Sequence, residues 1–193
     1  MNTIKKFVFL DTINQLISEN ILKIKNISVI NLINPYEKNK QTNINNFFKI
    51  IQFCKNNNVP FFITDNYKLA VKTKANGIYL NSFNKTNSYK SFGNEIDIIG
   101  VAHNQLEYYF KIRQNCKLIF LSPIFFTKKY STNKTLGTLR FNLISKNWKA
   151  KLGCLGGLTL QNLKKTKLTK VNAVGFKSLI YTENIKKPVY LKK

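Results

Sequence analysis

The sequence predicts a (β/α)8 barrel in a single domain spanning residues 1–193, and three observations favour this fold. Eight short apolar runs, bounded by turn-forming residues, are spread along the chain. Most of these runs lack polar alternation, which is typical of strands buried on both faces of a parallel sheet. Segments with helical spacing lie between them, so that strand and helix alternate. A doubly wound open sheet is the alternative architecture with the same alternation.

The predicted strands are runs rich in Ile, Val, Leu and Phe. In chain order they cover 6–10, 27–33, 60–64, 77–80, 97–102, 117–122, 151–156 and 171–176. The predicted helices are 43–57, 66–74, 104–115, 139–148 and 160–168. The helix at 43–57 illustrates the reasoning, because Ile44, Phe47 and Ile51 recur at intervals of three and four residues and so share one helix face.

Apolar patterning and cysteine use indicate the class of protein. The longest apolar runs, such as 7–10, are four residues, far below the roughly 20 residues of a membrane-spanning helix. Asp11 ends the first apolar patch before a signal peptide would be complete, so we expect an unprocessed cytoplasmic protein with no membrane partner. Cys54, Cys116 and Cys154 are far apart in sequence, which predicts buried free thiols and neither a disulfide framework nor a zinc site.

The charge balance is strongly basic, with 32 basic and 8 acidic residues and a net charge of +24. Such a charge would suit a nucleic-acid partner. However, Arg113 and Arg140 are the only arginines, although arginine is the usual reader of phosphates and guanine edges. The lysines are spread along the chain without a dense basic arm. We therefore expect only nonspecific binding to nucleic acid, at low salt.

In a barrel the functional residues stand at the carboxyl ends of the strands. Here polar and glycine residues gather where the predicted strands stop, at 64–66, 81–82, 102–103, 122–130, 156–157 and 176–178. The stretch SPIFFTKKY (122–130) brings Thr127, Lys128 and Lys129 to a strand end, and hydroxyl and ammonium groups suit phosphate oxygens. His103, the only histidine, follows the fifth strand, where a proton carrier could act.

Five segments resemble, in the right order, the thiamine phosphate synthase and TenI family of barrels. They are PFFITDNYKLA (60–70), KANGIYLNS (74–82), IIGVAHNQLE (98–107), LIFLSPIFFTKKYSTNKTLG (118–137) and CLGGLTLQNL (154–163). The corresponding family patterns are a strand followed by Asn-Asp-Arg, Ala-Asp-Gly-Val-His-Leu, Ile-Gly-Val-Ser-x-His, Gly-Pro-x-Phe-x-Thr and Ala-x-Gly-Gly-Ile-Thr. The resemblance covers about residues 59–180.

The resemblance implies a transferase of thiamine biosynthesis, which joins a pyrimidine pyrophosphate to a thiazole phosphate and releases pyrophosphate. It implies Mg²⁺ as cofactor with Asp65 as a carboxylate ligand, and Thr127 and Lys129 as catalytic residues; His103 is the further catalytic candidate because of its place at a strand end. Small phosphorylated molecules would then be the partners. The residues that it assigns to substrate and phosphate binding are Thr64, Thr127, Lys128, Lys129, Gly156, Gly157, Lys177 and Ser178.

The sequence departs from the family pattern at several of these positions. Asn84 stands where the family has its second magnesium carboxylate, and an amide oxygen is a poorer ligand for Mg²⁺. Thr64 replaces an asparagine, and the lysine of the pyrophosphate loop is displaced. The family's Gln-Leu-Arg-x-Lys after the second strand is missing, with only Lys38 nearby.

Other interpretations stay open. A TenI-like thiazole tautomerase would need His103 as its acid–base residue and a phosphate site but no magnesium. A non-catalytic or polyanion-binding protein on the same barrel is the third hypothesis. Asp65 could instead be a helix N-cap, and Lys128 and Lys129 a solvated surface pair. A homodimer is also open.

Overall fold

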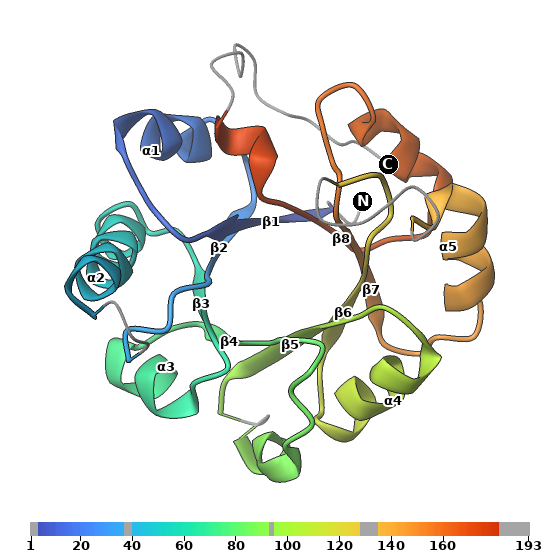
Figure 1. The fold of residues 1–193 in the computed structure, drawn as a ribbon, viewed down its shortest axis with the longest axis horizontal. Helices are drawn as coiled ribbons and strands as arrows, with labels where there is room; N and C mark the ends of the chain where they lie inside the picture. Colours follow the sequence, from blue (N-terminus) through green and yellow to red (C-terminus); the bar gives the residue numbers. More distant parts are fainter. Residues whose placement is uncertain (1–3, 37–39, 93–94, 128–134, 182–193) are drawn as a thin grey trace.

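The computed structural model describes residues 4–36, 40–92, 95–127 and 135–181, and these form a closed barrel of eight parallel strands (Figure 1). Each strand pairs with the next one in sequence, and β8 pairs with β1 from Lys5↔Ala173 to Val8↔Phe176. This last pairing closes the ring. The predicted barrel is therefore confirmed, and the open-sheet alternative is wrong.

All eight strands lie within a few residues of their predicted positions. They are β1 (Lys5–Leu10), β2 (Ile27–Asn31), β3 (Phe61–Thr64), β4 (Gly77–Leu80), β5 (Asp97–Ala102), β6 (Leu118–Leu121), β7 (Lys151–Leu155) and β8 (Ala173–Phe176). Nearly every strand residue is buried, because one face of the sheet packs inside the barrel and the other face packs against the surrounding helices.

The α-helices surround the ring (Figure 1). They are α1 (Gln15–Leu22), α2 (Lys40–Asn56), α3 (Tyr67–Thr73), α4 (Gln105–Arg113) and α5 (Gly137–Ser145). Asparagines cap three of them, since the side chains of Asn14, Asn66 and Asn104 accept from backbone N–H groups in the first turns of α1, α3 and α4. Asn66, and not Asp65, therefore caps α3, so the N-cap interpretation of Asp65 is wrong.

Among the described residues, three further connections are 3-10 helices, namely η1 (Asn87–Phe92), η3 (Leu163–Leu168) and η4 (Ser178–Tyr181). The predicted α-helix at 160–168 is therefore wrong in type. The hydroxyl of Thr166 donates to the Leu163 carbonyl at 2.7 Å, and that of Thr169 donates to the Thr166 carbonyl at 2.6 Å. These contacts three residues apart favour the tighter helix.

Aromatic side chains fill the barrel interior. Phe120 packs edge-to-face against Phe7 and Phe9, with ring centroids 5.4 and 5.9 Å apart, and Phe9 packs in the same way against Tyr79 at 5.2 Å. Gly153 leaves room for Phe120, because a Cβ there would lie 2.5 Å from its ring. The interior is thus a packed core that supports the carboxyl-end mouth from below.

The cysteines agree with the expectation of buried free thiols. Cys54, Cys116 and Cys154 are buried free thiols, and burial raises the pKa of each to about 12, which leaves them unreactive near neutral pH. In the described ranges, no helix combines the length and the apolar character that crossing a bilayer requires.

We predict that Phe120→Ala lowers the free energy of unfolding by about 3–5 kcal/mol, because it opens a cavity among the interior rings. Phe83→Ala is the matched control, since Phe83 is 76% exposed and should change stability by less than about 0.5 kcal/mol. Urea denaturation measures both changes. Equal small effects would contradict the packed interior.

Candidate functional site

A cavity of about 1020 Å³ opens at the carboxyl ends of the strands. Its lining comes from residues that follow β1, β2, β6, β7 and β8, together with residues near the ends of several strands. Five predicted site residues line it, although they come from three separate loops. They are Thr127, Gly156, Gly157, Lys177 and Ser178. The barrel therefore brings most of the predicted phosphate-binding residues to one place.

Much of the cavity wall is aromatic. Phe9, Tyr79, Phe126 and Tyr181 line it, and Leu32 and Leu155 add aliphatic residues. Ring faces and aliphatic side chains suit a flat heterocycle, while the few polar groups at the edge can orient a charged substituent. The cavity thus fits a molecule with an aromatic body and an anionic end.

The paired glycines join the loop after β7 to the loop after β6. Gly156 and Gly157 have φ values of +96° and +67°, in the region that favours glycine. A Cβ on Gly157 would lie 2.3 Å from the Phe126 carbonyl oxygen. Asn162 fixes this turn, because its amide donates to the Gly157 carbonyl at 2.7 Å and its Oδ1 accepts from Thr159 N at 2.8 Å. Glycine is therefore required here by backbone packing.

Lys177 is held by a carboxylate that the sequence analysis did not select. Its ammonium forms an ion pair with Asp11, which follows β1, and the hydroxyl of Tyr181 donates to the same carboxylate at 3.2 Å. Burial, followed by the charge of Asp11 and this hydrogen bond, raises the pKa of Tyr181 to about 12. The phenol therefore stays protonated as a donor, and Lys177 lies in place at the cavity edge.

Asp65 lies at the end of β3 but does not line this cavity. Its Oδ1 accepts from the Asn81 backbone at 3.2 Å and from the Asn84 amide at 2.7 Å, and its Oδ2 accepts from the Asn81 amide at 2.7 Å. Its φ of +49° is unusual for a residue other than glycine. The carboxylate thus ties the end of β3 to the loop that follows β4.

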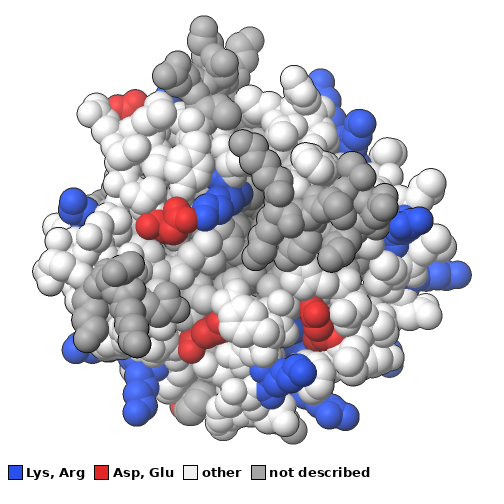
Figure 2. Space-filling model, in the orientation of Figure 1, with Lys and Arg blue, Asp and Glu red and all other residues white. Residues whose placement is uncertain are grey.

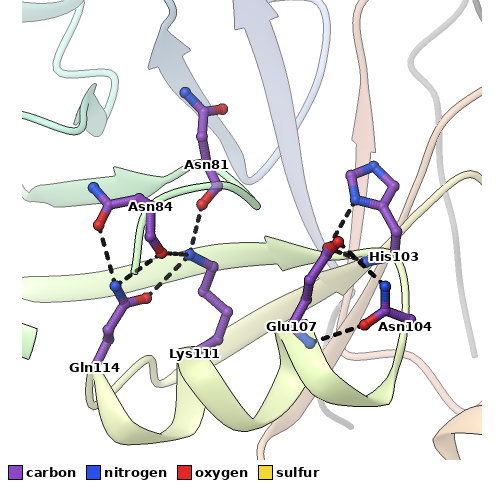
Figure 3. A network of polar contacts seen from close by, with 7 residues as sticks. All are labelled: Asn81, Asn84, His103, Asn104, Glu107, Lys111 and Gln114. Atoms are coloured by element: carbon purple, nitrogen blue, oxygen red, sulfur yellow. Dashed lines mark hydrogen bonds and ion pairs between the residues drawn. The ribbon is translucent and has the colours of Figure 1, made fainter. Parts of the chain in front are cut away.

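A buried lysine supports this loop from helix α4 (Figure 3). Lys111 has no exposed surface, and its ammonium donates to the Asn81 carbonyl at 2.5 Å, the Asn84 carbonyl at 2.8 Å and Gln114 Oε1 at 3.0 Å. Burial lowers the pKa of Lys111 from its usual value, whereas neighbouring Cys116, Asp65 and Glu107 act in the opposite direction. A single lysine in helix α4, in a chain rich in lysine, gave no sequence signal for this role.

The donor set around Asp65 does not fit a preformed magnesium site. Mg²⁺ needs hard oxygen ligands in near-octahedral geometry. Asp65 supplies the carboxylate here, and both of its oxygens face amide N–H groups of Asn81 and Asn84. Among the residues that the structure describes, no three His, Cys, Asp or Glu side chains are grouped to hold a metal ion.

His103 follows β5 and is also outside the cavity lining. Its Nδ1 lies 2.9 Å from Glu107 Oε2, which accepts from the His103 backbone at 2.8 Å (Figure 3). Asn104 Nδ2 donates to the other Glu107 oxygen at 3.2 Å. Glu107 therefore orients the imidazole at the first turn of α4, and the catalytic role of His103 stays a prediction.

The remaining predicted residues divide into two groups. The hydroxyl of Thr64 donates to the Asn31 carbonyl at 2.7 Å, which links the ends of β2 and β3. Lys128 and Lys129 lie outside the described residues, as does Lys38. Figure 2 shows most basic side chains of the described part of this face spread around its edge, with one beside an acidic side chain near the centre.

A comparison with models of protein families identifies one family for this chain. The family model described as thiamine monophosphate synthase matches residues 10–180, which is most of the chain. This chain belongs to that family. The expected family resemblance is therefore confirmed, and the match also covers residues 10–58, including β2, which the resemblance in sequence did not reach.

Two curated relatives of the family are similar along most of their length. The thiamine-phosphate synthase of Flavobacterium psychrophilum is 28% identical, with 73% of this chain and 74% of the relative aligned. The thiamine-phosphate synthase of Pelagibacter ubique is also 28% identical, with 96% and 93% aligned. Among solved structures, thiamine phosphate pyrophosphorylase from Pyrococcus furiosus matches with a TM-score of 0.71 at 16% identity, covering 95% of this chain and 91% of that one. This structural likeness supports the barrel fold.

We predict that Gly157→Ala lowers the free energy of unfolding by about 1–3 kcal/mol and displaces the glycine turn, because its methyl group would overlap the Phe126 carbonyl. Gly137→Ala is the control, since Gly137 has a similar φ of +61° but no atom within 4 Å of the added Cβ, so only backbone strain of about 1 kcal/mol applies. Chemical denaturation of both variants measures the difference. A larger loss for Gly137→Ala would contradict the packing role.

Proposed function

We propose that this chain is a transferase of the thiamine phosphate synthase type, which joins a hydroxymethylpyrimidine pyrophosphate to a thiazole phosphate and releases pyrophosphate. The observation that carries this proposal is the cavity at the mouth, where Thr127, Gly156, Gly157, Lys177 and Ser178 meet an aromatic wall. Family membership and the two curated synthases at 28% identity support the same reaction.

The thiazole phosphate is assigned to the loops after β7 and β8. Gly156 and Gly157 place main chain in the cavity lining, where backbone N–H groups would bind an oxyanion, and Lys177 and Ser178 add an ammonium and a hydroxyl. Asp11 keeps the Lys177 ammonium at the cavity edge before the ligand arrives. Loops after the seventh and eighth strands are the usual phosphate site of barrels.

The pyrimidine pyrophosphate is assigned to the side of the cavity near Thr127. The hydroxyl of Thr127 would bind a pyrophosphate oxygen, with Lys128 and Lys129 as the proposed cationic partners. As the leaving group departs, positive charge develops at the pyrimidine methylene, and the ring faces of the wall would stabilise it while excluding water. Because the described residues around Asp65 do not fit a preformed magnesium site, we assign no step to a metal held there by the protein alone.

A second candidate function, TenI-like thiazole tautomerisation, is supported by one specific contact. His103 is paired with Glu107 at a strand end, and this reaction needs a proton carrier and no metal. The pair lies outside the cavity lining, which favours the synthase.

Purified protein incubated with both substrates and Mg²⁺ should form thiamine phosphate and pyrophosphate in equal amounts, as measured by chromatography. Conversion of the thiazole phosphate tautomer in the absence of the pyrimidine substrate, lost in His103→Ala, would instead support the tautomerase. Absence of both reactions would reject both enzymatic proposals.

We predict that Lys177→Ala weakens binding of thiazole phosphate roughly 10–100-fold, because one charge-assisted hydrogen bond contributes about 1.5–3 kcal/mol. Lys164→Ala is the matched control, since Lys164 is exposed on η3 and should leave affinity unchanged. Isothermal titration calorimetry measures both. Unchanged affinity in Lys177→Ala would place the phosphate elsewhere.

A further inference from the structure

The corner formed by the end of β3 and the loop after β4 contains the Asp65 carboxylate and the buried Lys111 ammonium, which are linked by Asn81 and Asn84. Each asparagine faces both charges: the backbone carbonyls of Asn81 and Asn84 accept from Lys111, and their side-chain amides donate to Asp65. The negative and positive charges are therefore connected through two short polar links inside the protein.

The orientation of the Asn84 amide is fixed by its surroundings. Its Oδ1 accepts from Thr86 N at 3.1 Å and from Gln114 Nε2 at 3.2 Å. Because both groups are donors, the amide oxygen must face them, and the NH₂ group must face Asp65. Asn84 consequently presents a donor to the carboxylate, at the place where a metal ligand would present an oxygen.

Lys111 has the contacts expected of an ammonium group. It meets three acceptor oxygens, which match the three N–H bonds of the charged form, whereas a neutral amine has only two. Gly100 leaves room for its aliphatic stem, since a Cβ there would lie 2.8 Å from Lys111 Cδ. The buried charge is thus fully coordinated by protein oxygens.

We infer that Lys111 is the fixed counter-ion of Asp65. Because position 84 is an asparagine, hydrogen bonds hold this corner together where a second carboxylate would form a divalent-cation site with Asp65. The ligand-free protein then binds no divalent cation at Asp65. A second carboxylate at position 84 would face Asp65 and supply the hard oxygens that Mg²⁺ or Mn²⁺ requires. The ligand-free protein is sufficient for the test, whatever reaction the protein catalyses.

The first experiment titrates the substrate-free full chain with Mn²⁺ and follows free Mn²⁺ by electron paramagnetic resonance. Wild-type protein should show no saturable binding at millimolar Mn²⁺, whereas Asn84→Asp should gain one saturable site. Asn147→Asp, the same change at an exposed position, should behave as wild type. Saturable wild-type binding that Asp65→Asn abolishes would overturn the inference, and so would a folded Asn84→Asp variant that gains no site.

A second experiment keeps the inference testable if Asn84→Asp does not fold. Lys111→Met should clearly lower the urea denaturation midpoint of the wild-type protein, because it leaves the Asp65 carboxylate without its counter-ion. The same substitution should lower the midpoint much less in Asp65→Asn, which has no carboxylate at position 65. Lys146→Met, at an exposed position after α5, controls for the loss of one lysine. Additive losses from Asp65→Asn and Lys111→Met would contradict the counter-ion role.

Discussion

The pairing of β1 with β8 is the constraint on which the rest of the structure depends. Because all eight strands are parallel, closing the ring places every carboxyl end at one mouth. Asp11 and Lys177, which are 166 residues apart in sequence, therefore form an ion pair beside the glycine turn after β7. The cavity exists only because the first and last strands are neighbours, and the aromatic interior supports that arrangement from below.

The mouth has two halves with different physical character. The half formed by the loops after β6, β7, β8 and β1 is open, with an aromatic wall and an ammonium group at its edge. The half formed after β3, β4 and β5 is closed by hydrogen bonds, since Asp65, Lys111 and Glu107 all have side-chain partners there. Helix α4 supports this closed half through both Glu107 and Lys111 (Figure 3). Our proposal therefore assigns substrate binding to the first half, whereas the hydrogen bonds of the second connect the strand ends.

Much of the fold could be predicted from the sequence, because buried parallel strands produce short apolar runs that are easy to recognise. The residues that line the cavity could also be predicted in part, since barrel topology fixes where strand ends lie. The Asp11–Lys177 pair could not, because it depends on ring closure and not on local pattern. Lys111 was missed because nothing in the sequence of a lysine-rich chain distinguishes a buried lysine from a solvated one, and the room that Gly100 provides is visible only in three dimensions.

The central claim is that the loops after β7 and β8 form the phosphate site of this family member. A crystal structure of the protein with thiazole phosphate tests it most directly. The account predicts the phosphate group within hydrogen-bond distance of the backbone at Gly156 and Gly157 and of the Lys177 ammonium, with the thiazole ring against the aromatic wall. A phosphate bound at the Asp65 corner or outside the mouth would contradict it.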